Sequence, residues 1–470
     1  MEAHARLRHL QDLPSPSGLP LIGNALQLKP FTLHTSLEQW ARKLGSPYRY
    51  RVGNTNVLVW TQAELCQAVL RERPHLYRRI APIESVLGEI GINGLFSAEG
   101  AAWEPQRRLI MQALSISNIK AFYPTLAAIT ERFRQRLQRA AAQGKPLEMT
   151  DELKRYTVDV TSSLAFGEDP NTLEQEGGVI QERLALILPA VMRRTNAPFP
   201  YWRYVRLPSD RKLDRAMLDV HRFVHDMIGR ARERMRDAPG DAPRNLLEAM
   251  LAARDTPDSG VTDAQIAANV LTLLIAGEDT TANTIAWSLM YIAADPALQQ
   301  RLSDASRGAF GGERICPDYG TLKQLDLCEA ASNEASRLRP VAVILGFEPL
   351  EDVCLDGIAV PAGTWVFFLT RPPMLEPANF AHPERFDPDR WMHHHDASRG
   401  AHEQRAYLTF GGGPRVCPGR YLATVEIRLV LSMIAANFDV SMAIDPATIT
   451  EISAFTMVPS RMPMHLKPRA

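Results

Sequence analysis

The long apolar segment between Thr262 and Pro296 places the strongest constraint on how this chain folds. It opens with Thr262 and Gln265 at the spacing of a capping box, and an alanine-rich apolar run then leads to a stop at Asp295-Pro296. This pattern predicts one helix of about 30 residues, which is about 45 Å long at 1.5 Å per residue. A helix of that length is long enough to cross a whole domain.

The middle of this predicted helix contains the polar run Ala276-Gly277-Glu278-Asp279-Thr280-Thr281. A glycine inside a helix costs about 1 kcal/mol relative to alanine, and buried polar groups add to that cost unless they are hydrogen-bonded. One interpretation is structural, with a threonine hydroxyl bonded back to the carbonyl four residues earlier. The other is a functional site. The helix by itself leaves both open.

A glycine-rich loop near the C-terminus holds a single cysteine, in the sequence Phe410-Gly411-Gly412-Gly413-Pro414-Arg415-Val416-Cys417-Pro418-Gly419-Arg420. Pro418 suits the first turn of a helix, and apolar residues from Leu422 onward predict one that ends near Phe438. Cys417 then lies at a helix N-terminus, which favours the thiolate, and a thiolate can ligate a metal. A phosphate-binding loop is the alternative, but the lysine followed by Ser or Thr of that pattern is absent.

Composition limits the classes of function. The 470 residues include 53 Lys and Arg against 53 Asp and Glu, which disfavours nucleic acid as a partner. The five cysteines are scattered without a C-x-x-C pair, and neither a signal peptide nor a run of about 18 apolar residues occurs. We therefore expect a soluble cytoplasmic protein without a membrane anchor.

The remaining patterns predict the architecture. A hairpin is predicted from Tyr48 to Trp60 around Gly53, and short strands between Val353 and Phe368, while helical periodicity dominates between them. Neither a repeat nor a long linker divides the chain. We expect one catalytic domain over residues 1–470, mainly α with a small β-rich part (α+β).

The spacing F-x-x-G-x-R-x-C-x-G, matched at Phe410, Gly413, Arg415, Cys417 and Gly419, resembles the haem-binding loop of the cytochrome P-450 monooxygenases. The A-G-x-D/E-T-T run is similar to the oxygen-activation segment of the same family, and the resemblance covers nearly the whole chain. It implies a soluble, bacterial-type haem-thiolate member. Haem b would lie between the long helix and the helix after the cysteine loop, with the Cys417 sulfur as the axial ligand of the iron.

The resemblance also implies individual roles. Thr280 would hydrogen-bond dioxygen and Asp279 would relay protons, while Ala276 and Gly277 leave room above the iron. The cofactor-binding residues it implies are Trp103 and Arg107 of a W-x-x-x-R motif, together with Arg415, Phe410, Gly411, Gly413 and Gly419. A buried network of Glu334, Arg337 and Arg385, from the E-x-x-R and P-E-R-F motifs, would support the haem loop.

Two departures from the family pattern concern the haem propionates. Phe347 stands where many members carry a propionate-binding arginine, and Leu375-Glu376-Pro377 replaces the usual R-D-P. Propionate anchoring is then left to Trp103, Arg107 and Arg415. The stretches that resemble the substrate pocket are apolar and predict a lipophilic substrate; their residues are Val341, Val343, Ile344, Phe347, Phe455 and Met457.

The expected function is insertion of one oxygen atom of dioxygen into a lipophilic small molecule, by hydroxylation or epoxidation, in secondary metabolism. Only about 50 residues follow Cys417, too few for a flavin module, so electrons from NADPH or NADH would come through a separate ferredoxin or flavodoxin with its reductase. We expect a monomer. The alternatives are a haem-based sensor or carrier without turnover, against which Asp279-Thr280 argues, and a peroxide-driven haem enzyme.

Two other clusters receive structural interpretations. Adjacent histidines in His393-His394-His395-Asp396 rarely converge on one metal ion, so we expect no metal site there. Basic and aromatic residues alternate between Arg193 and Arg203 as they do on nucleic-acid-binding surfaces, but the balanced charge favours part of a lid over the pocket.

Overall fold

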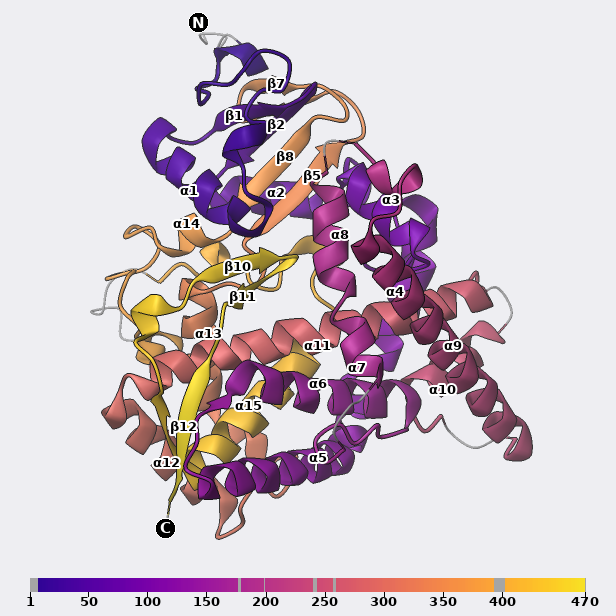
Figure 1. Cartoon of the computed structure of the whole chain (residues 1–470), viewed down its shortest axis with the longest axis vertical. Helices are drawn as coiled ribbons and strands as arrows, with labels where there is room; N and C mark the ends of the chain where they lie inside the picture. Colours follow the sequence, from indigo (N-terminus) through magenta and orange to yellow (C-terminus); the bar gives the residue numbers. More distant parts are fainter. Residues whose placement is uncertain are drawn as a thin grey trace, which may run out of the picture.

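The computed structural model describes residues 7–175, 179–197, 199–239, 243–256, 259–392 and 402–469, and the His393–Asp396 segment lies outside these. Helix α11 (Asp263–Ala293) has 31 residues and crosses the middle of the molecule (Figure 1). The predicted capping box is confirmed, because the Thr262 hydroxyl accepts from the Gln265 amide at 3.3 Å and the Thr262 amide donates to Gln265 Oε1 at 2.8 Å. The central helix thus begins where the sequence predicts.

Other helices surround α11 on several sides. Helix α6 lies along it, and the close approach depends on Gly277, where a Cβ would lie 2.9 Å from the Thr161 hydroxyl. Helices α13 and α15 pack on it as well. The other helices are α1 (Leu33–Leu44), α2 (Ala63–Arg71), α3 (Ala81–Glu89), α4 (Trp103–Ala113), α5 (Ile116–Ala142), α6 (Met149–Phe166), α7 (Val179–Leu184), α8 (Ile187–Thr195), α9 (Pro208–Asp237), α10 (Leu246–Arg254), α12 (Pro296–Phe310), α13 (Asp326–Leu338), α14 (Arg371–Met374) and α15 (Arg420–Asn437).

The largest sheet has five strands in the order β1-β2-β8-β5-β3 and lies toward the N-terminal end of the molecule (Figure 1). Its β1–β2 hairpin, with Val52 opposite Thr55, confirms the predicted turn at Gly53. Smaller sheets pair β4 and β9 with β12, β6 with β7, and β10 with β11. The strands are β1 (Tyr48–Val52), β2 (Thr55–Trp60), β3 (Tyr77–Arg79), β4 (Leu147–Glu148), β5 (Ile344–Pro349), β6 (Val353–Leu355), β7 (Ile358–Val360), β8 (Trp365–Leu369), β9 (Phe438–Met442), β10 (Glu451–Ala454), β11 (Thr456–Pro459) and β12 (Pro463–Pro468).

The hydrophobic core lies mainly on the two sides of α11. One cluster joins α5, α6, α12, α13 and α15 around Trp287, and a second joins α3, α4, α9 and α10 around Leu271. The predicted α+β class is confirmed. Among the described residues, none of the helices has both the length and the apolar character needed to cross a bilayer.

Candidate functional site

The cysteine loop is fixed in place by its backbone. The Cys417 amide donates to the Phe410 carbonyl at 3.0 Å, which closes the loop just before α15. Gly413 has a φ of 62°, and a Cβ there would lie 2.1 Å from the Leu70 carbonyl oxygen at the end of α2. Only glycine allows this approach, so the glycine positions the loop against α2 and leaves the Cys417 side chain accessible.

Cys417 is partly accessible to solvent, but its thiol is largely surrounded by protein atoms. This burial raises the pKa of the thiol, while the Gly419 and Arg420 amides and the positive charge of Arg107 lower it. The predicted preference for thiolate is therefore wrong for the free thiol. Helix α15 begins only at Arg420, so Pro418 precedes the helix and the dipole acts from a greater distance. A metal would supply the missing stabilisation, since a coordinating thiol is deprotonated outright.

The polar run of α11 presents two different faces. Ala276 is exposed, and Thr280 lies on the same face of the helix. The Thr280 hydroxyl donates to the Ala276 carbonyl at 2.7 Å, which is the bond to the carbonyl four residues earlier that the structural interpretation predicts. Gly277 contacts Thr161 of α6. The prediction that Gly277 leaves room above an iron is therefore wrong, because a residue one position along a helix is turned by about 100°. Ala276 is exposed, so the prediction that it leaves room above an iron stays a prediction.

Asp279 is held by both of its carboxylate oxygens. Lys154 of α6 donates to Oδ1 at 2.9 Å, and the Thr456 hydroxyl at the start of β11 donates to Oδ2. The neighbouring Glu278 is only 5% exposed, and burial raises its pKa to about 8. Neither Lys154 nor Thr456 is marked by any motif in the sequence.

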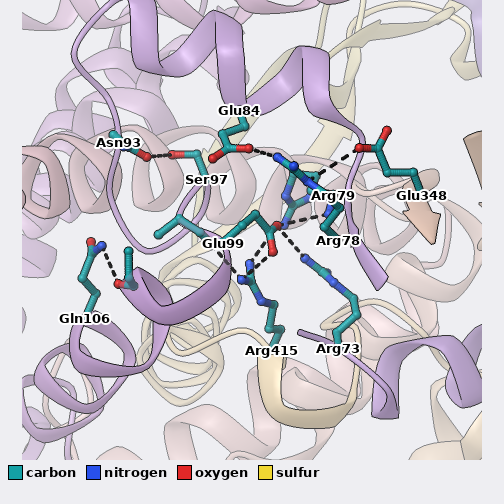
Figure 2. A network of polar contacts seen from close by, with 12 residues as sticks. Arg73, Arg78, Arg79, Glu84, Asn93, Ser97, Glu99, Gln106, Glu348 and Arg415 are labelled. Atoms are coloured by element: carbon teal, nitrogen blue, oxygen red, sulfur yellow. Dashed lines mark hydrogen bonds and ion pairs between the residues drawn. The ribbon is translucent and has the colours of Figure 1, made fainter. Parts of the chain in front are cut away.

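Three arginines, Arg73, Arg79 and Arg415, lie around the carboxylate of Glu99 (Figure 2). Arg107 is a charged neighbour of Arg415, and we call these four residues the arginine cluster. Arg415 pairs with Glu99 at 2.7 Å and Arg73 at 3.3 Å, while the Arg79 amide donates to the same carboxylate at 3.1 Å. Burial lowers the pKa of Arg73 to about 10 and that of Arg79 to about 9. Three of these arginines share the single negative charge of Glu99, so the cluster carries a surplus of positive charge.

The cluster also leaves hydrogen-bonding capacity unused. The Nε atoms of Arg73, Arg79 and Arg415 are buried and have no hydrogen-bond partner among the described residues. Buried donors without partners are costly, and surplus cations among them favour an anionic ligand. A haem brings two carboxylates, and Arg107 is close enough to Cys417 for the two charges to interact. The residues present thus fit a haem with its iron on Cys417.

Some of the residues predicted to bind the haem lie side by side. Arg415 lies over the Trp103 ring, with 4.8 Å between its Cζ and the ring centroid. Sequence reasoning missed Arg73, Arg79 and Glu99. The guanidinium carbon of Arg73 lies 4.7 Å from the centroid of the Phe347 ring, so a cation is present beside the position where Phe347 stands. No signal in the sequence connects these two residues, since the sheet alone brings them together.

The predicted support network is present, with one correction. Glu334 accepts from Arg337 at 2.8 Å and from the Arg390 Nε at 2.9 Å, and it also accepts from the Trp391 indole at 2.9 Å. Burial opposes the charge of Glu334, but these arginines lower its pKa below the usual value. Arg385 contributes only its carbonyl, to Arg337, and its side chain is exposed. The predicted role of the Arg385 side chain is wrong, because the chain turns after Pro383 and brings Arg390 inward.

The predicted pocket residues differ in exposure. Ile344 and Phe455 are partly exposed, whereas Val341, Val343 and Met457 are buried. Phe347 is 1% exposed and packs in the core beneath the five-stranded sheet, under Arg73. Its predicted place in the substrate pocket is therefore wrong.

Fold and site together define a protein built to hold a haem on a cysteine. The family model described as cytochrome P-450 matches residues 13–465, and the chain belongs to this family. Cyclooctatin synthase of Streptomyces melanosporofaciens is 28% identical, with 92% of this chain and 90% of that protein covered. Cyclooctat-9-en-7-ol 5-monooxygenase of the same organism is 27% identical, covering 90% and 88%. Cytochrome P-450 3A11 of Mus musculus is 25% identical, covering 91% and 85%.

Family membership settles the class of chemistry. The chain is an oxidoreductase of the cytochrome P-450 class, its cofactor is haem b, and electrons reach it indirectly through redox partners. The family also implies a lipophilic substrate.

Proposed function

We propose that this protein inserts one oxygen atom of dioxygen into a lipophilic small molecule of secondary metabolism, by hydroxylation or epoxidation. Two Streptomyces relatives, cyclooctatin synthase and cyclooctat-9-en-7-ol 5-monooxygenase, support this substrate class. The observation that carries the proposal is the accessible Cys417 thiol beside the arginine cluster with its unpaired Nε atoms. Together they match the iron and the two carboxylates of one haem.

When bound, the haem supplies dioxygen activation, to which a thiolate ligand contributes electron density that favours cleavage of the O–O bond. The residues of the chain hold and orient it. Cys417 would hold the haem iron through its sulfur, and Trp103, Arg107 and Arg415, joined by Arg73 and Arg79, would bind the carboxylates through charge-assisted hydrogen bonds. Phe410, Gly411, Gly413 and Gly419 shape the loop that presents the sulfur.

The distal side of the site handles protons. Thr280 lies on the same face of α11 as the exposed Ala276, so its hydroxyl is placed to hydrogen-bond a small ligand there. Asp279, joined to Lys154 near the surface of the molecule, carries protons toward that hydroxyl. We infer electron supply from a separate ferredoxin or flavodoxin with its reductase, which uses NADPH or NADH, and a monomeric enzyme.

The spectrum of the reduced carbon-monoxide complex tests the haem assignment. The wild-type protein should give the absorption band of a thiolate-ligated haem, and Cys417→Ser should lose it because a hydroxyl does not replace the thiolate. Cys354→Ser is the matched control, since Cys354 is the other exposed cysteine among the described residues and lies on β6. A Cys417→Ser protein that keeps the band overturns the assignment.

Turnover distinguishes an oxygenase from a haem-based sensor or carrier. With a ferredoxin and its reductase, the wild-type protein should consume NADPH and oxygen. Thr280→Ala should retain haem and divert more electrons to hydrogen peroxide, because proton delivery is impaired. A protein that binds haem but consumes no oxygen with an electron donor favours the sensor.

A further inference from the structure

The β10–β11 hairpin is firmly attached at its base. Glu451, the first residue of β10, accepts from Arg371 at 2.6 Å and lies 2.9 Å from the His34 Nε2 atom. Arg371 in turn pairs with Glu38 of α1. These contacts bind the start of the hairpin to elements that lie far from α11 in the sequence. The opposite end of the hairpin is held differently.

The turn of this hairpin contains a strained residue. Phe455 has a φ of 84°, in the left-handed region that is unfavourable for a non-glycine residue. Its ring packs on Phe96 with 5.6 Å between the ring centroids, yet the side chain stays partly exposed. A residue held in this conformation is retained by its surroundings. The contacts of the turn therefore maintain the strain.

The next residue ties the turn to the polar run of α11. Thr456 is 7% exposed and donates its hydroxyl to Asp279 Oδ2, while Lys154 holds the other oxygen at 2.9 Å. The buried Glu278 on α11 is a further charged neighbour of Asp279. The carboxylate of Asp279 is thus fixed from α6 on one side and from the hairpin on the other.

We propose that Thr456 is a positioning residue that restrains Asp279 in the ligand-free protein, and that a lipophilic ligand which contacts the partly exposed Phe455 and displaces it releases this restraint. The two residues share a peptide unit, so a move of Phe455 out of its strained conformation also reorients Thr456. Proton delivery then depends on whether such a ligand is bound. This inference rests on the proposed function, because it states when Asp279 becomes free to carry protons toward Thr280.

The kinetic test uses the holoenzyme with a ferredoxin and its reductase and no added ligand. Thr456→Val keeps the shape of the side chain and removes the hydroxyl, so oxygen consumption should rise by about tenfold or more, the effect of one lost hydrogen bond to a charged group. Thr456→Ser restores a hydroxyl and should behave as the wild type. Thr450→Val, an exposed threonine beside the hairpin, is the matched control.

A double variant separates restraint of Asp279 from a merely structural role. In an Asp279→Asn background, Thr456→Val should cause no further rise, because the two changes act through one contact. A rise of equal size in both backgrounds would contradict the inference, as would unchanged oxygen consumption in Thr456→Val.

Hydrogen exchange gives a readout that does not depend on turnover. Clotrimazole, a bulky lipophilic azole, should speed amide exchange of residues 453–459 in the wild-type holoenzyme, and these amides should already exchange fast in Thr456→Val without it. Identical exchange in both proteins, with and without clotrimazole, overturns the inference. Loss of the thiolate-type carbon-monoxide spectrum in the wild type would instead reject the proposed function, so the two failures are distinguishable.

Discussion

Replacement of Gly413 by alanine should dislodge the cysteine loop. The residue has a φ of 62°, which costs an alanine about 1–2 kcal/mol. The added Cβ would also lie 2.1 Å from the Leu70 carbonyl oxygen and 2.7 Å from its carbon. Both are backbone atoms at the end of α2, so no side-chain rotation relieves the overlap. The loop or the helix end must move.

The size of the effect follows from these two contributions. Overpacking that forces a backbone shift costs about 1–3 kcal/mol, so the total is about 2–5 kcal/mol for Gly413→Ala. Gly411 offers a matched control, because its φ is 70° but a Cβ there meets nothing within 4 Å. Gly411→Ala should therefore cost only about 1–2 kcal/mol. The difference between the two variants isolates the contact with α2.

Haem content measures whether the loop has moved. Both variants would be purified with excess haem, and the haem-to-protein ratio compared by the pyridine haemochrome assay alongside urea unfolding. Gly413→Ala should lose most of its thiolate-ligated haem, because Cys417 follows the displaced residue by four positions, whereas Gly411→Ala should retain it. Equal haem content and equal unfolding free energies in the two variants would refute the argument from the Leu70 contact.

Arg390→Ala should destabilise the protein by about 1.5–3 kcal/mol, because the buried Glu334 loses one charged hydrogen bond but keeps Arg337, while Arg385→Ala should change the unfolding free energy by less than about 0.5 kcal/mol. Urea unfolding compares the two, and equal effects would contradict the assignment of Arg390. Burial raises the pKa of Glu426 from 4.5 to about 8, so the unfolded chain loses this proton first and stability falls as pH rises between these values. Glu426→Gln should remove that part of the decline, and an unchanged pH profile would show that Glu426 does not titrate. Arg73→Met keeps contact with the Phe347 ring but removes a cation, so haem should transfer to apomyoglobin about tenfold faster; an unchanged rate would exclude Arg73 from the haem site.

Local patterns determined the parts of the site that lie within one segment. The capping box at Thr262 and Gln265 set the start of α11, and the spacing from Phe410 to Gly419 defined the loop that presents Cys417. Such features depend on backbone geometry and on neighbours a few residues apart. They are therefore readable before the chain is folded.

The tertiary structure decided which distant side chains complete the site. Arg73 reaches Phe347 through the pairing of β3 with β5, and Arg390 rather than Arg385 reaches Glu334 because the chain turns between them. Thr456 meets Asp279 only because the hairpin packs on α11. These contacts join residues that are far apart in the sequence, or depend on the path of an irregular segment. Charge balance and packing in the folded protein select them, and neither is encoded in a local spacing.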